Sequence, residues 1–302
     1  MWVAWDDAAA RRIASATFLS PSVLAERGTT RRAAAALVAA GDLIRLRNGR
    51  SVPADTHPRL IEAGRLGGRL DCVSLLYALG VFVRATGGLH VQFEHAKTRL
   101  PVRAAHVRAH WRVTDRERSA MAADIVEALA QACRCQKPRD AVATLDNARH
   151  VGLVDDDDLA AVFLRLPRRL RFLQSLMDAR SESGPETLVR LLLRGLGCTV
   201  EVQVQIDGVG RVDLLVDGWL IVECDSRAHH EGWEAQKRDR RRDVAAAALG
   251  YMTVRPIAED ILNRYDEILG AMKSALHCRA VQNSTDRAAG APKPRRSGLA
   301  KG

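Results

Sequence analysis

The chain has 302 residues, enough for about two domains of ordinary size. Its composition, 47% hydrophobic and 27% charged, excludes a fully disordered or fibrous chain. No stretch approaches the run of about 18 apolar residues that spans a bilayer, and Asp6 and Asp7 stand where a signal peptide carries basic residues. We therefore expect a cytoplasmic protein with no membrane contact.

The formal net charge of +10 at pH 7 favours a polyanionic partner, since surface lysines and arginines bind phosphates. Part of this charge belongs to a basic tail, residues 279–302, which we expect to be disordered. Arginine-rich compositions also occur in proteins from GC-rich genomes, so charge alone leaves the partner open.

The cysteines and histidines give no recognisable ligand pattern. Of the six cysteines only Cys133 and Cys135 lie close together, and this spacing matches no zinc or disulfide framework. We expect reduced cysteines with structural roles. Four histidines of the middle region also show no ligand spacing to one another, and for each we expect a structural role: His90, His106, His110 and His150.

Residues 1–56 predict three helices followed by a short hairpin. A cap at Thr29 or Thr30 begins the third helix, over residues 31–40, and Asn48-Gly49 supplies the hairpin turn. This is the order of a winged helix-turn-helix, whose third helix enters the major groove of DNA. A solvated helix packed on its neighbours and a protein interaction module are the alternatives. The candidate DNA contacts are Thr30, Arg31 and Arg32 on the helix and Arg45, Arg47 and Arg50 in the wing.

Residues 57–180 predict a mixed α/β region that connects the two ends of the chain. Alternating apolar residues predict half-buried strands over 89–93 and 107–113. Three helices are expected after them, over residues 118–132, 138–149 and 157–164.

Residues 181–278 predict a helix, three strands, a charged helix and a fourth strand. An Asp217-Gly218 turn joins the second and third strands, so that residues whose numbers sum to about 435 face one another. Asp213 would then face about Val222, and with a slip of one residue Asp213 and Glu223 become cross-strand neighbours. Two carboxylates so placed can hold one Mg²⁺ or Mn²⁺, and nearby arginines can hold a phosphate.

Four motifs carry a resemblance to a known family: Val212-Asp-Leu-Leu-Val216, Ile221-Val-Glu-Cys-Asp-Ser-Arg-Ala-His-His230, Arg238-Asp-Arg-Arg-Arg-Asp243 and Leu249-Gly-Tyr-Met-Thr-Val-Arg255. They resemble the Vsr-like branch of the PD-(D/E)xK endonuclease superfamily, and residues 16–54 resemble the winged helix of AbiEi-type antitoxins. The resemblance implies an α+β, multidomain protein. Its parts are a winged helix-turn-helix (1–56), a mixed α/β connecting region (57–180), a restriction-endonuclease-like α/β/α domain (181–278) and the tail (279–302).

The resemblance also implies a metal-dependent DNA endonuclease. Asp213 and Glu223 hold the cation, and Glu186 reaches in from the preceding helix. Asp225 lies where many members of the superfamily have the catalytic lysine, and His229 or His230 is the candidate for proton transfer. The catalytic candidates are thus Glu186, Asp213, Glu223, Asp225 and His230, with Arg238 and Arg242 as further DNA contacts.

Each acid also has a purely structural interpretation. Glu186 fits a helix cap, Asp213 a hydrogen-bond acceptor at a strand end, and Glu223 an ion-pair partner of an arginine. The rival function is a non-catalytic DNA-binding regulator, or an antitoxin-like protein that keeps an inactive nuclease fold. RNA is an alternative substrate, because arginine contacts to phosphate carry no information about the sugar. A homodimer is left open.

Overall fold

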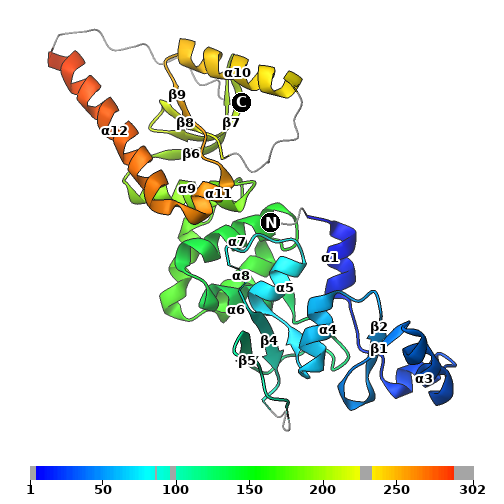
Figure 1. Cartoon of the computed structure of the whole chain (residues 1–302). Helices are drawn as coiled ribbons and strands as arrows, with labels where there is room; N and C mark the ends of the chain where they lie inside the picture. Colours follow the sequence, from blue (N-terminus) through cyan, green and yellow to red (C-terminus); the bar gives the residue numbers. More distant parts are fainter. Residues whose placement is uncertain (1–4, 86, 96–99, 225–232, 289–302) are drawn as a thin grey trace. The chain divides into compact units, whose positions relative to one another are not determined.

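The computed structural model describes residues 5–85, 87–95, 100–224 and 233–288 (Figure 1). The chain is of the α+β class and divides into two compact units, Met1–Leu191 and Leu192–Gly302. Among the residues described, no helix is long and apolar enough to cross a membrane.

The first unit begins with the expected three helices and hairpin. Thr30 caps the third helix, because its Oγ1 accepts a hydrogen bond from the backbone N–H of Ala33 at 3.1 Å. This helix ends at Gly41, whose φ of +86° is left-handed. The elements are α1 (Asp7–Ala14), α2 (Pro21–Glu26), α3 (Arg31–Ala40), β1 (Leu43–Arg45), the short helix η1 (Arg47–Gly49) and β2 (Ser51–Pro53).

A three-stranded sheet follows, in the order β3-β4-β5. β4 pairs antiparallel with β3 and parallel with β5. All five residues of β4 are buried, so the expectation of a half-buried strand was wrong there. The elements are α4 (Pro58–Arg65), β3 (Arg69–Leu70), α5 (Cys72–Ala78), β4 (Leu89–Phe93) and β5 (Val107–Trp111).

Helices complete the first unit: α6 (Ile125–Cys135), α7 (Pro138–His150), α8 (Asp156–Arg165) and the 3-10 helix η2 (Arg168–Leu176). The second and third lie close to their expected bounds. The first was expected from residue 118, but it begins only after the cap at Asp124. Ala120 and Ala122, which precede it, instead form bridges with Thr17 and Leu70.

A buried ion pair ties α7 to α9 (Gly184–Gly195) within the first unit. The carboxylate of Asp146 accepts hydrogen bonds from Arg190 Nη2 at 2.7 Å, from Thr187 Oγ1 at 2.9 Å and from the backbone N–H of Asp178 at 3.0 Å. The side chains of Asp146 and Arg190 are both 0% exposed. The start of α9 is therefore fixed by charge-assisted bonds as well as by apolar packing.

The second unit holds a four-stranded sheet in the order β6-β7-β8-β9, in which the last pair is parallel and the others antiparallel. Its element order is the expected one. One helix, α10, packs Ala246 into an apolar cluster on the sheet. The elements are β6 (Val200–Ile206), β7 (Gly210–Val216), β8 (Leu220–Val222), α10 (Trp233–Ala248), β9 (Met252–Val254), α11 (Ala258–Asn263) and α12 (Tyr265–Ala288).

The last helix corrects one expectation. α12 continues to Ala288, so residues 279–288 are helical and the expected disorder was wrong for them. Residues 289–302, the rest of the basic tail, lie outside the described part of the chain.

Candidate functional site

The sheet of the second unit brings Asp213 and Glu223 to facing positions. β7 and β8 pair with Leu214 opposite Val222, a register in which paired numbers sum to 436. The next step of this register, one residue beyond the end of β8, would set Asp213 opposite Glu223, and the negative charge of Asp213 acts on the Glu223 carboxyl. Both residues of the connecting turn, 217–218, have positive φ, as a two-residue hairpin turn of type I′ requires.

The strand is irregular at Asp213 itself. The ladder between β6 and β7 omits the pair that would join Gln203 to Asp213, and Gln203 has a φ of +54°. In a regular strand Val212 and Leu215 would lie on opposite faces, yet both pack into the apolar cluster beneath α10. β7 is therefore distorted at its acid, a feature that recurs beside active sites.

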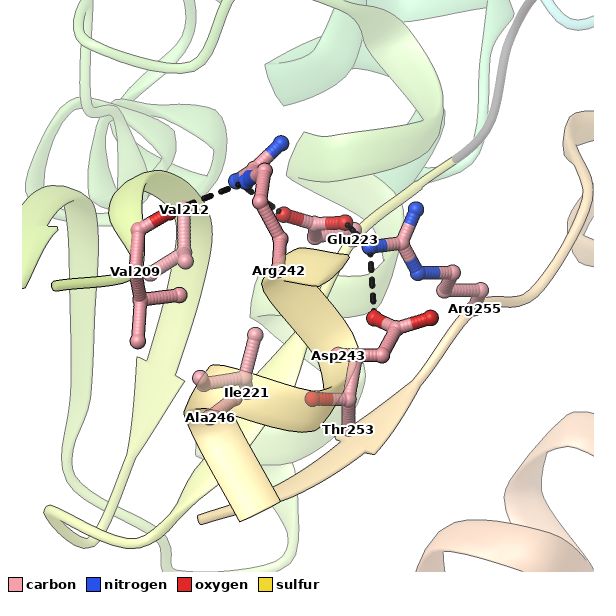
Figure 2. A pocket seen from close by; sticks show the side chains of 9 residues that line it. All are labelled: Val209, Val212, Ile221, Glu223, Arg242, Asp243, Ala246, Thr253 and Arg255. Carbon is pink, nitrogen blue, oxygen red and sulfur yellow. Dashed lines mark hydrogen bonds and ion pairs between the residues drawn. The ribbon is translucent and has the colours of Figure 1, made fainter. Parts of the chain in front are cut away.

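Glu223 lies between two arginines (Figure 2). Its Oε1 accepts a hydrogen bond from Arg242 Nη2 at 2.8 Å, and its Oε2 lies 2.6 Å from Arg255 Nη2. The same nitrogen of Arg255 also lies 2.8 Å from Asp243 Oδ1. These four side chains line one small pocket against α10. Two carboxylates and two guanidinium groups thus form one network.

The charges around Glu223 oppose one another. Burial raises the pKa of its carboxyl above the ordinary value of 4.5, while the positive charges of Arg255 and Arg242 lower the pKa. The negative charges of Asp213 and Asp243 raise the pKa further. The negative charges of Asp213 and Glu223 therefore repel each other, and a bound cation or a nearby arginine relieves this repulsion.

The structural interpretation of each acid is also present as a contact. Asp213 Oδ2 accepts a hydrogen bond from the backbone N–H of Cys224 at 2.9 Å. Glu186 belongs to the first unit and is 5% exposed. Its carboxylate accepts from the N–H of Glu182 at 2.9 Å, and its own N–H donates to Ser183 Oγ at 3.3 Å. Helix capping at Glu186 is thus confirmed.

The donor atoms of the acid pair suit Mg²⁺ or Mn²⁺, because carboxylate oxygens are the ligands that hard cations prefer. Both oxygens of Glu223 are engaged by arginine in this arrangement. Because each carboxylate oxygen has two lone-pair positions, a cation shared with Asp213 would bind beside these arginine contacts or displace one of them.

α10 carries the remaining candidates of the second unit. Arg242 is turned inward, because it also donates to the backbone oxygens of Val209 at 3.1 Å and Arg211 at 2.7 Å. Arg238 is exposed on the same helix. The predicted Asp225, His229 and His230 lie outside the described residues.

The candidates of the first unit divide into exposed and partly covered side chains. Arg50 lies over the ring of Phe18 at 4.8 Å, and burial lowers the pKa of its guanidinium. Arg47 is partly buried in the wing. Every residue of α3 is at least partly exposed, and the candidates that face solvent are Thr30, Arg31, Arg32 and Arg45.

A second group of polar side chains in the first unit was missed by sequence reasoning. We call it the Cys/His cluster: Cys72, His90, His110 and Cys135, whose ligand atoms all lie within 4.8 Å of one another. The residues come from four elements and are far apart in sequence, so no short spacing could show them. The one available signal was a pair of polar residues, His90 and Gln92, that share one face of a strand whose other positions are apolar.

Neither a model of a known protein family nor a curated protein matches the chain. The evidence for function is therefore the arrangement of residues within the two units.

Proposed function

We propose that the protein is a metal-dependent DNA endonuclease whose active site is built on the sheet of the second unit. The register that sets Asp213 opposite Glu223, beside two arginines, carries the proposal. The order of helix, three strands, helix and strand supports it, because this is the order implied by the Vsr-like resemblance.

The residues of the site divide the chemistry between them. Mg²⁺ or Mn²⁺ held by Asp213 and Glu223 supplies water activation and neutralises charge on the phosphate when bound. Arg242 and Arg255 present planar guanidinium groups, which suit the oxygens of a phosphodiester. Moving one of them from Glu223 to the phosphate would clear the carboxylate for the cation.

α10 supports nucleic acid as the partner. Trp233 is 59% exposed, and the side chains of Lys237 and Arg240 lie 5.9 and 5.4 Å from the centre of its ring. Arg238 and Arg240 are exposed on the same helix. An exposed aromatic ring among basic side chains is typical of surfaces that bind single strands, since bases stack on the ring while cations contact phosphates.

The first unit supports binding to duplex DNA. Arg31 and Arg32 stand exposed at the start of α3, the third helix in the order of a winged helix-turn-helix. In such domains the first turn of the third helix meets the major groove. Binding by this unit and cleavage by the other would be separable.

A specific observation favours the rival function, a non-catalytic DNA-binding regulator. Both carboxylate oxygens of Glu223 are ion-paired with arginine, the arrangement of an acid that serves only to hold a scaffold together. The endonuclease and the regulator differ in whether Asp213 and Glu223 are needed for cleavage.

The test is incubation of purified full-length protein with supercoiled plasmid and with mismatched duplexes, in Mg²⁺, Mn²⁺ or EDTA. We expect nicking with either metal and none with EDTA. Asp213→Asn should lower the cleavage rate by at least about 100-fold, the scale of losing a charge-stabilising group. Asp207→Asn is the matched control, because Asp207 is an exposed acid in the β6–β7 turn of the same sheet.

The outcomes separate the hypotheses. Cleavage that Asp213→Asn abolishes while DNA affinity is kept supports the endonuclease. Tight binding without cleavage in any metal would establish the regulator instead. Cleavage of RNA but not of DNA would identify RNA as the substrate. If the protein neither binds nor cleaves nucleic acid, nucleic acid is overturned as the partner.

A further inference from the structure

We propose that the Cys/His cluster of the first unit binds one structural Zn²⁺, through Cys72 Sγ, Cys135 Sγ and one ring nitrogen each of His90 and His110. This site is independent of the endonuclease proposal.

The atoms are spaced like the corners of a zinc tetrahedron. His90 Nδ1 and His110 Nε2 lie 3.0 Å apart, and His110 Nε2 lies 3.9 Å from Cys135 Sγ. Ordinary Zn–N and Zn–S bond lengths give tetrahedron edges of about 3.3 to 3.8 Å. With all four ligand atoms within 4.8 Å of one another, only small side-chain movements separate the cluster from coordination.

The fold points the four side chains to one place. His110 faces Gln92 across the β4–β5 pair, and Gln92 lies two residues after His90, so both histidines project from the same face of the sheet. Cys72 is the first residue of α5, and Cys135 is the last residue of α6. Each helix thus contributes the cysteine at one of its ends, and the two strands contribute the histidines on one shared face.

Three residues of the cluster are buried, and Cys135 is half-buried. Cys72 is 0% exposed, His90 6% and His110 8%. Cys72 also has a left-handed φ of +54°, a conformation that is costly for a residue other than glycine unless its surroundings hold it. The Nε2 amide of Gln131 donates to Cys135 Sγ at 3.3 Å, the kind of outer contact that orients a thiolate ligand.

The charge balance favours zinc at this depth. Two thiolates and two neutral imidazoles around Zn²⁺ sum to zero charge, so the complex can be buried without a further counter-ion. The nearest buried acid, Asp71, is already paired with Arg112 at 2.6 and 2.8 Å. Tetrahedral sulfur and nitrogen ligands suit Zn²⁺, and four protein ligands leave no open position for substrate. The role is therefore structural.

The first experiment measures metal in the full-length protein after purification without chelator. We expect inductively coupled plasma mass spectrometry to find one zinc per chain. Substitution with Co²⁺ should give the visible absorption bands of a tetrahedral thiolate site. Cys135→Ala should reduce zinc below about 0.1 per chain, because each ligand is needed for tight binding. Cys133→Ala, two residues away in the same helix and buried in an apolar core, should keep it.

A second pair of variants tests the imidazole ligands. A third experiment uses the wild-type protein, so that no folding defect can enter. His110→Gln should lose zinc, while His106→Gln, at an exposed histidine just before β5, should keep it. In the wild-type protein, p-hydroxymercuribenzoate should release zinc as thiolates are derivatised, read with a chelating dye. Wild-type protein that holds no zinc and takes up no Co²⁺ would overturn the proposal. So would a Cys72–Cys135 disulfide, iron with labile sulfide, or zinc retained in Cys135→Ala/His110→Gln.

Discussion

Two sites place polar groups in the protein interior by opposite means: the Cys/His cluster, and the acid site formed by Asp213 and Glu223 with Arg242 and Arg255. In the first unit, sulfur and nitrogen atoms gather with no opposite charge among them. In the second, the carboxylate of Glu223 is matched by two guanidinium groups. The difference teaches how each site treats charge: the proposed zinc would neutralise two thiolates of the cluster, whereas at Glu223 a cation would add to two arginines that already oppose the carboxylate.

The largest expected effect comes from a fully buried ion pair, Asp146 with Arg190. Asp146→Ala removes the acceptor of three hydrogen bonds, including the carboxylate that accepts from Nη2 of the fully buried Arg190. We expect the free energy of unfolding to fall by about 3 to 5 kcal/mol. Chemical denaturation followed by circular dichroism measures this change.

The matched control is an exposed ion pair of the same unit. Asp156 pairs with Arg149 at 2.8 Å, but its side chain is 83% exposed. Asp156→Ala should leave the free energy of unfolding nearly unchanged, because solvent screens an exposed pair. Equal effects of the two substitutions would contradict the claim that burial decides the worth of a charged pair here.

Sequence reasoning found the acid site because its geometry is local. A two-residue turn fixes the register of β7 on β8, and the estimated sum of 435 differs from the observed 436 by one residue. It did not find that Arg242 and Arg255 close on Glu223, because those residues come from α10 and from beyond β9. Helix and strand patterns do not state which side chains will meet.

The Cys/His cluster shows the limit more sharply. Its four residues are brought together only by the packing of α5 and α6 on β4 and β5, which no spacing rule encodes. The same long-range packing misplaced the start of α6. An alanine-rich run at 118–123 looks helical, but bridges to Thr17 and Leu70 hold two of its residues extended. Tertiary contacts override local preference in both cases.

A smaller effect tests whether the arginines compete with a cation for Glu223. Arg255→Gln removes one positive charge from its carboxylate, so Mn²⁺ should bind more tightly, by about 3- to 10-fold, or about 1 kcal/mol. Electron paramagnetic resonance of free Mn²⁺ measures the affinity. Arg264→Gln, which breaks an exposed ion pair elsewhere in the unit, should leave it unchanged. Weaker Mn²⁺ binding in Arg255→Gln would mean that this arginine supports the cation site.

The smallest effect is on the pH dependence of stability. Because burial raises the pKa of Glu223 in the folded state, the native protein takes up a proton there more readily than the unfolded chain. The free energy of unfolding of the wild type, measured against Glu223→Gln, should therefore fall as pH rises through the ordinary value of 4.5 and level off above the raised pKa. The total change should stay below about 1 kcal/mol, since Arg242 and Arg255 offset most of the burial cost.

Equilibrium denaturation of both proteins at a series of pH values between about 4 and 8, the range across which a carboxyl with a raised pKa titrates, provides this difference. A difference that instead grows with pH would show that the two arginines outweigh burial and lower the pKa of Glu223. A cation would then have to displace a stabilising contact of Glu223 rather than a nearly neutral one.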